Sequence, residues 1–170
     1  SFTSLACAMI GQHSEMYGVP ELNLFMANDM DEFWSGTDPD GRFKSPLWPI
    51  QRHGVLRTVA HFFAGEQTIE SIKMAQRWIR VRARLTTAQV YRILCEKAAP
   101  LRLIDKSPGY LRRKKYMDLM LQAFPDARFI HLLRHPRGQC ESILKVKGGS
   151  LAMLMVNSID YTGKTPILDP

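Results

Sequence analysis

Two short apolar segments, each followed at once by polar residues, constrain the fold of this chain more than any other feature. Residues 101–104 precede Asp105-Lys106-Ser107-Pro108, and residues 128–133 precede Arg134. Both segments are short, apolar and β-prone, as buried strands are, and residues 109–124 between them have a helical pattern. A strand, a helix and a second strand form a right-handed crossover unit with parallel strands. The sequence therefore predicts an α/β protein with a mainly parallel sheet.

The second of these segments leads into a pattern that suits phosphate binding. Pro136 fits the first position of a helix, so a helix is predicted over residues 137–147. In open α/β sheets, ligands bind beyond the carboxyl ends of the strands, where helix N-termini offer amide donors to anions. Arg134 at the strand end adds a guanidinium, and Ser142, eight residues later on the helix, adds a hydroxyl. This spacing predicts a phosphate site.

The same block resembles the second nucleotide-binding signature of sulfotransferases that use 3′-phosphoadenosine 5′-phosphosulfate (PAPS). The upstream Asp105-Lys106-Ser107-Pro108 and the segment FPDARFIHLLRHPR are similar to that family too. They are most similar to the sulfotransferase domains of polyketide and olefin synthases, and also to tyrosylprotein and carbohydrate sulfotransferases. The resemblance covers residues 1–147. It implies a P-loop-like three-layer fold with a mainly parallel central sheet and a helical insertion over the cleft, in which Arg134 and Ser142 bind the 3′-phosphate.

The start of the chain is similar to the family's first cofactor element. Residues 4–13 read as a helix, which in the family follows a loop of the form Arg-Ser-Gly-Thr-Thr that wraps the 5′-phosphosulfate. In an ungapped alignment, Ser1, Thr3 and Ser4 fall on the hydroxyl positions of this loop, and Phe2 falls on its Gly. In a second register, with a helix one turn longer, Ser1 is the last residue of the loop, and both registers remain open. Residues 1–170 are expected to form a single sulfotransferase-like domain that lacks the first strand, part of the P-loop and the C-terminal part of the family fold.

Two further residues are candidates for catalysis through the resemblance. Val19-Pro20-Glu21-Leu22 resembles the segment after the first helix in the synthase-type members, and its Glu lies where tyrosylprotein sulfotransferases place a catalytic carboxylate. Glu21 is therefore expected to accept the proton of the acceptor hydroxyl. Lys106 follows a strand end, and the family's Asp-Lys-Ser/Thr-Pro motif uses this Lys on the transferring group. Without the resemblance, the ordinary interpretation of Glu21 is an exposed loop residue. That of Lys106 is a solvated charge or a partner of Asp105.

Charge and composition narrow the class of protein further. The net charge is +7, and 13 of the 23 basic residues lie between Lys73 and Lys115, which favours an anionic ligand. No nucleic-acid-binding signature, membrane-spanning run or metal-ligand spacing is present in the sequence, so no nucleic acid, membrane or metal is expected within these residues. The three cysteines are expected to be buried, reduced thiols. A cytoplasmic location is expected.

The expected function is the transfer of a sulfuryl group from PAPS to an acceptor hydroxyl, leaving 3′-phosphoadenosine 5′-phosphate (PAP). The acceptor is a carrier-bound polyketide, a tyrosine, a sugar or a small alcohol, and the sequence does not choose among them. One alternative is a degenerate or incomplete sulfotransferase that serves as a nucleotide-binding or interaction module without activity. A P-loop nucleotide kinase is the other, and it is disfavoured because no Walker A motif is present.

Overall fold

The computed structural model describes residues 3–36, 48–133 and 135–145. The chain divides into two units, residues 4–128 and a second unit of residues 1–3 with 129–170. The described part of the second unit contains Thr3, residues 129–133 and the helix α8 (Pro136–Lys145). This helix begins at Pro136, in agreement with the helix predicted there. Asp38-Pro39-Asp40-Gly41, a sequence that predicts a turn, lies outside the described residues.

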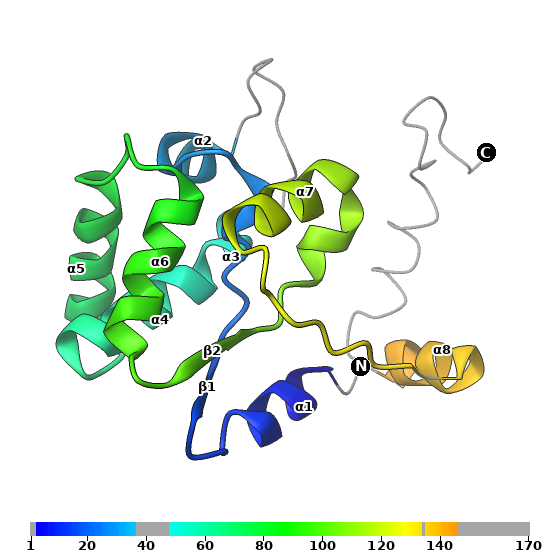
Figure 1. The fold of residues 1–170 in the computed structure, drawn as a ribbon. Helices are drawn as coiled ribbons and strands as arrows, with labels where there is room; N and C mark the ends of the chain where they lie inside the picture. The colour runs from blue at the N-terminus through cyan, green and yellow to red at the C-terminus, as the bar shows by residue number, and fades with distance from the viewer. Residues whose placement is uncertain (1–2, 37–47, 134, 146–170) are drawn as a thin grey trace. The chain divides into compact units, whose positions relative to one another are not determined.

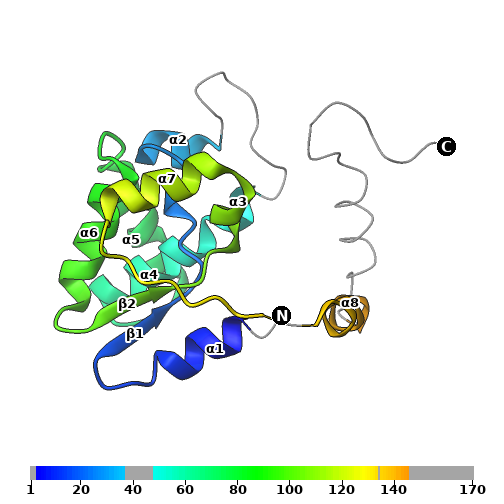
Figure 2. The same cartoon turned by 45° about the vertical axis from the view of Figure 1, so that its right-hand side comes forward.

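Two parallel strands form the sheet of the larger unit. β1 (Met16–Val19) pairs with β2 (Arg102–Asp105), with Met16 opposite Arg102 and Val19 opposite Asp105. Figures 1 and 2 show α1 (Thr3–Ile10) on one side of these strands and α4 and α6 on the other. The predicted α/β class with parallel strands is confirmed, and so is the strand predicted at 101–104, which is shifted by one residue.

β1 is an element that the sequence did not predict. It has four residues, one of them Gly18, and only Val19 is fully buried, so it lacks the apolar run that marks a central strand. Gly18 is needed because α1 crosses very close to the strand: a Cβ on Gly18 would lie 2.9 Å from the carbonyl oxygen of Cys7. Glycine therefore permits the close packing of helix on strand at the cost of a weak strand signal.

Three amphipathic helices form the layer on the other side of the strands. They are α4 (His53–Ala64), α5 (Ile69–Arg80) and α6 (Thr87–Ala98). The sequence Thr86-Thr87-Ala88-Gln89 predicts a capping box at the start of a helix, and Thr86 does cap α6. Its hydroxyl accepts from the backbone N–H of Gln89, and the Gln89 side chain accepts from the backbone N–H of Thr86. α5 has the same kind of cap at Thr68. The sequence pattern predicts a helix over residues 68–84, but α5 ends at Arg80 because residues 81–84 form turns.

The remaining elements of this unit are shorter. They are η1 (Leu24–Met26), α2 (Met30–Ser35), α3 (Trp48–Gln51), η2 (Pro108–Arg112) and α7 (Lys114–Ala123). The helix predicted from Gly109 to Phe124 is thus divided into η2 and α7. Arg113 between them has extended backbone angles (φ −144°, ψ 135°), which end the first turn and start the second helix.

The core of the larger unit is centred on Phe25, which is 2% exposed. Its ring packs against those of Tyr91, Tyr110 and Phe124, with centroids 5.2, 5.6 and 6.1 Å away. These rings come from α6, η2 and the end of α7, so one aromatic cluster fixes the loop after β2 against the helical layer. Burial of a side chain of this size stabilises the fold by about 2–3 kcal/mol.

The strand predicted at residues 128–133 is not formed. These residues have no regular secondary structure, and the apolar side chains of the segment are exposed. Phe129 is 55% exposed and Leu133 is 82% exposed. A strand exists only where its backbone N–H and C=O groups pair with a neighbour. Within the described residues this segment has no such neighbour, so its β-prone composition alone does not produce a strand.

Candidate active site

The carboxyl ends of β1 and β2 bring two of the expected site residues together. Glu21 lies two residues beyond the end of β1, and Lys106 directly follows β2. Since the strands are parallel and in register, both residues emerge at the same edge. The Nζ atom of Lys106 donates to Oε1 of Glu21 in an ion pair. The Lys106 side chain is 21% exposed and that of Glu21 is 43% exposed, so the pair is reachable from solvent.

The backbone that carries Glu21 is tied to the residues that flank Lys106. The N–H of Leu22 donates to Oδ1 of Asp105 at 3.3 Å, and the N–H of Asn23 donates to Oγ of Ser107 at 3.0 Å. Leu22 is fully buried and Asn23 is 4% exposed. Asn23 also has a left-handed conformation (φ 54°, ψ 14°), which Asn tolerates better than most residues. The two hydrogen bonds therefore fix a sharp change of chain direction directly after Glu21.

Helices α3 and α4 hold the same segment from another side. A Cβ on Gly54, in the first turn of α4, would lie 1.8 Å from the carbonyl oxygen of Glu21. The helix can approach the Glu21 backbone this closely only because the residue is Gly. The side chain of Asn23 donates from Nδ2 to the carbonyl oxygen of Gln51, at the end of α3, at 3.2 Å. The segment Glu21–Asn23 is thus anchored to β2 and to both helices.

The carboxylate of Asp105 accepts three hydrogen bonds at this edge of the sheet. Besides the N–H of Leu22, its carboxylate accepts from the Ser107 hydroxyl at 2.6 Å and from the Tyr110 hydroxyl at 2.8 Å. Burial raises the pKa of Asp105 to about 6; the hydrogen bonds from Ser107, Tyr110 and Leu22 oppose this rise, and the nearby charge of Glu21 adds to it. Lys106 pairs with Glu21 and not with Asp105, contrary to the ordinary interpretation of an adjacent Asp-Lys pair.

The cysteines differ from one another in their surroundings. Cys7 is buried, and its sulfur lies 3.7 Å from the carbonyl oxygen of Ile104 and 3.9 Å from that of Val19, beneath the ends of both strands. Burial raises the pKa of Cys7, and the charge of Asp105 raises it further, so the thiol stays protonated. Burial also raises the pKa of half-buried Cys95 to about 11. The expectation of buried thiols was wrong for Cys140, which is exposed.

The expected phosphosulfate and phosphate residues are described only in part. Thr3 and Ser4 form the first turn of α1, and Ser4 is exposed. The N-terminus of a helix is the positive end of its dipole, which favours an anion nearby. Ser1 and Arg134 lie outside the described residues. Ser142 lies on α8, and its side chain lies outside the described part. The roles of these residues stay predictions.

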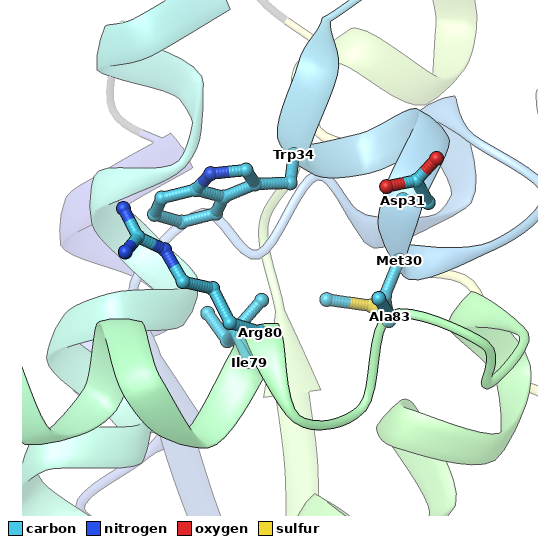
Figure 3. A pocket seen from close by; sticks show the side chains of 6 residues that line it. All are labelled: Met30, Asp31, Trp34, Ile79, Arg80 and Ala83. Carbon is cyan, nitrogen blue, oxygen red and sulfur yellow. The ribbon is translucent and has the colours of Figure 1, made fainter.

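The described residues show a pocket elsewhere in the larger unit (Figure 3). It has a volume of about 310 Å³ and is lined by Met30, Asp31, Trp34, Ile79, Arg80 and Ala83. The guanidinium of Arg80 lies 5.6 Å from the centre of the Trp34 ring, and that of Arg52 lies 4.6 Å from it. None of the expected site residues lines this pocket. The pairing of Glu21 with Lys106 therefore marks a different place in the molecule.

In ranges 3–36, 48–133 and 135–145, no group of three or more His, Cys, Asp or Glu side chains is arranged to hold a metal ion. Among the helices of the same ranges, none has the length and apolar character needed to cross a membrane.

The sequence missed the residues that position the site more than those within it. Asp105 was noted only as a neighbour of Lys106, and Ser107, Asn23 and Gly54 carried no assigned role. For Asp105 and Ser107, the available signal was the short Asp-Lys-Ser motif directly after a predicted strand. No local pattern indicates that Gly54 lies against Glu21, because that contact joins residues 33 positions apart.

Comparisons with known proteins agree with this architecture. A model of the sulfotransferase family matches residues 1–165. No curated protein matches the chain. Among solved structures, a sulfotransferase domain from the curacin biosynthetic pathway is 25% identical over 90% of this chain, with a TM-score of 0.69. A sulfotransferase domain from the Synechococcus PCC 7002 olefin synthase is also 25% identical over 90% of the chain, with a TM-score of 0.68.

The chain spans about half the length of both solved relatives, since 50% of each is covered. The family match nevertheless extends over nearly all of the 170 residues. The two structural relatives share the parallel-strand fold on which the Glu21 and Lys106 edge is built. The chain belongs to the sulfotransferase family.

Proposed function

We propose that the protein transfers a sulfuryl group from PAPS to the hydroxyl of an acceptor. The observation that carries this proposal is the ion pair of Lys106 with Glu21 at the carboxyl ends of two parallel strands. A cation and a carboxylate in contact, both partly exposed, are the two groups that such a transfer requires from the protein. Family membership supports the reaction class, and the ion pair supports the choice of Glu21 and Lys106 as the residues that act on the reacting groups.

Glu21 accepts the proton of the acceptor hydroxyl. The acceptor oxygen forms a bond to sulfur while the bond between sulfur and the bridging oxygen of the donor breaks. Lys106 donates a hydrogen bond to that bridging oxygen, which gains negative charge as it leaves with PAP. PAPS itself supplies the sulfuryl group, and the carboxylate and ammonium of this chain handle the proton and the developing charge.

The ion pair also implies an exchange of partners between the resting and the loaded protein. Without a ligand, Glu21 and Lys106 neutralise each other in a partly buried position. When Lys106 turns to the bridging oxygen, the carboxylate of Glu21 is released from its counter-charge and is free to accept a proton. A Lys ammonium suits this exchange because its three donors lie on a flexible stem.

The remaining contacts to the donor are assigned by resemblance. Ser1, Thr3 and Ser4 bind the 5′-phosphosulfate, and Arg134 and Ser142 bind the 3′-phosphate. Fit to a doubly anionic nucleotide is supported by the positive dipole end of α1 and by the excess of basic over acidic residues. The acceptor is expected to be a carrier-bound polyketide, a tyrosine, a sugar or a small alcohol.

The test has two stages in the full-length protein. Calorimetry with PAP measures whether the nucleotide binds, and PAPS labelled in its sulfuryl group is then offered with a panel of alcohols, phenols, sugars and carrier-bound hydroxyls. We expect micromolar binding, as for ordinary enzyme ligands, and transfer to one acceptor class. Binding of PAP without transfer to any acceptor would support the alternative of a binding module. Failure to bind PAP contradicts the proposal outright.

A further inference from the structure

The proposed base is held in place by two residues that have no chemical role of their own. Glu21 is followed by Leu22 and Asn23, and the backbone N–H groups of these two residues donate to Asp105 and Ser107 respectively. Both acceptors sit at the end of β2, 83 and 84 residues away along the chain. The position of the Glu21 backbone therefore depends on the end of a different strand.

We propose that Asp105 and Ser107 are positioning residues that set the location of Glu21 relative to Lys106. This inference rests on the proposed role of Glu21 as the base. The two acceptors are the residues immediately before and after Lys106. One tripeptide, Asp105-Lys106-Ser107, thus carries the cation for the leaving oxygen and also the two acceptors that hold the segment of the base.

The geometry of the tripeptide explains how it serves both purposes. In an extended chain, alternate side chains point to opposite sides. The Ser107 hydroxyl donates to Oδ1 of Asp105 at 2.6 Å, so these two side chains lie together, while Lys106 between them reaches Glu21. This donation also orients the hydroxyl, and a lone pair of Oγ is left to accept from Asn23 at 3.0 Å. The hydrogen bonds therefore form a chain from Asn23 through Ser107 to Asp105.

The opposite side of the segment restricts its movement in one direction. Gly54 lies against the carbonyl of Glu21 with no room for a Cβ, and Leu22 and Leu24 are fully buried. Contact with α4 blocks displacement in that direction only, so the hydrogen bonds to Asp105 and Ser107 fix the remaining directions, and loss of an acceptor leaves Glu21 free to move relative to Lys106. A misplacement of about 1 Å in a reacting group lowers the rate by as much as a hundredfold.

The charge of Asp105 gives this arrangement a pH dependence. An ionised carboxylate only accepts hydrogen bonds, which suits three donors, whereas the protonated form also donates. The titratable groups that face Asp105 are Cys7 on α1, Glu21, Tyr91 on α6 and Tyr110 on η2, while the Lys106 side chain is paired with Glu21. Of these, Tyr110 donates to the carboxylate directly at 2.8 Å.

The decisive experiment is a double-mutant cycle of Ser107→Ala with Glu21→Gln, measured as kcat in the full-length protein. We expect Ser107→Ala alone to lower kcat roughly tenfold to a hundredfold, with the affinity for PAP unchanged. In the Glu21→Gln background, the same substitution should change kcat by less than about threefold, because there is no base left to misplace. Ser107→Thr, which keeps a hydroxyl, should restore most of the rate.

Ser71→Ala serves as the matched control. Ser71 is also a buried serine, 4% exposed, and its hydroxyl also bonds to backbone, but in the cap of α5. It should lower the thermal midpoint as Ser107→Ala does and leave kcat unchanged. A second readout is the pH profile: Asp105→Asn should flatten the acidic limb of kcat/KM, while Ser71→Ala should not.

The outcomes separate the positioning role from the proposed function. If Glu21→Gln keeps the wild-type kcat, the assignment of the base fails and the positioning role fails with it. If Glu21→Gln is slow but Ser107→Ala has the wild-type kcat, or lowers kcat equally in both backgrounds, the positioning role alone is overturned. Should Glu21→Gln have no measurable turnover, rescue by Ser107→Thr at unchanged PAP affinity decides: rescue supports the role, and its absence removes it.

Discussion

The segments at residues 101–104 and 128–133 were both predicted to be strands, yet the structure forms a strand only at the first. The first forms β2, pairs with β1 and carries Lys106 into contact with Glu21. The second has no regular structure, and Phe129, Ile130, Leu132 and Leu133 are all exposed. Apolar, β-prone composition was common to both. The difference teaches that such a segment becomes a strand only where a partner strand and a covering layer of side chains are supplied.

The largest expected effect comes from substituting the two proposed catalytic residues, which lie beyond the ends of β1 and β2. Glu21→Gln and Lys106→Ala should each lower kcat by about 10²- to 10⁴-fold, the usual contribution of a positioned acid, base or charge-stabilising group. PAP affinity should be spared by Glu21→Gln, which is measured by calorimetry beside steady-state turnover. Wild-type turnover in Glu21→Gln would remove Glu21 from its role and leave the β2 edge without a base.

Stability should divide the two regions almost as clearly. Phe25→Ala removes the ring that joins η1, α6, η2 and α7, and should lower the free energy of unfolding by about 3–5 kcal/mol. Phe129→Ala removes the same number of atoms from a side chain that is 55% exposed. It should change the free energy of unfolding by less than about 0.5 kcal/mol. Urea unfolding of both variants checks this. Equal losses would mean that residues 128–133 are packed in solution.

The second region is expected to bind and not to catalyse. Arg134→Ala should weaken PAP binding by about 1.5–3 kcal/mol, the value of a hydrogen bond to a charged group. Arg128→Ala is the matched control, because it removes the same charge from an exposed position in the same segment. Calorimetry with PAP distinguishes the two. If both substitutions weaken PAP binding equally, Arg134 contributes only its positive charge and makes no specific hydrogen bond to the phosphate.

The smallest expected effect is the pH dependence of stability at the β2 edge. Burial raises the pKa of Asp105 from 3.8 to about 6. Since the folded protein binds this proton more tightly than the unfolded chain, ionisation lowers stability. The free energy of unfolding should therefore fall by roughly 2 kcal/mol as the pH rises from about 4 to about 6, with a small further fall up to about pH 7 and no change from this group above it. Urea unfolding of the wild type and Asp105→Asn across the window isolates this effect, and identical slopes would refute it.

The sequence predicted those features that are local and strongly patterned. Thr86 and Gln89 predicted the start of α6, Pro136 predicted the start of α8, and the apolar run before Asp105 predicted β2. The juxtaposition of Glu21 and Lys106 was expected through the family resemblance. Parallel strands then supplied the geometry that no single segment encodes.

What could not be predicted depends on contacts between distant parts of the chain. β1 was missed because Gly18 replaces the side chain that would signal a strand, for the sake of close packing with α1. The role of Asp105 was missed because its partners, the N–H groups and hydroxyls of Leu22, Ser107 and Tyr110, are common to any sequence. Residues 128–133 are apolar and β-prone, as the sequence indicated, but the strand predicted there was wrong because composition does not specify a pairing partner.

The absence of space above Gly54 has a consequence for any attempt to change the acceptor of the proposed reaction. Any side chain introduced there would displace the carbonyl of Glu21, so a change in the first turn of α4 would also change the position of Glu21. A library aimed at new acceptors should therefore keep residue 54 constant and vary side chains on other helices. Variants that expand or shrink the acceptor's room elsewhere can then inherit an undisturbed reaction centre.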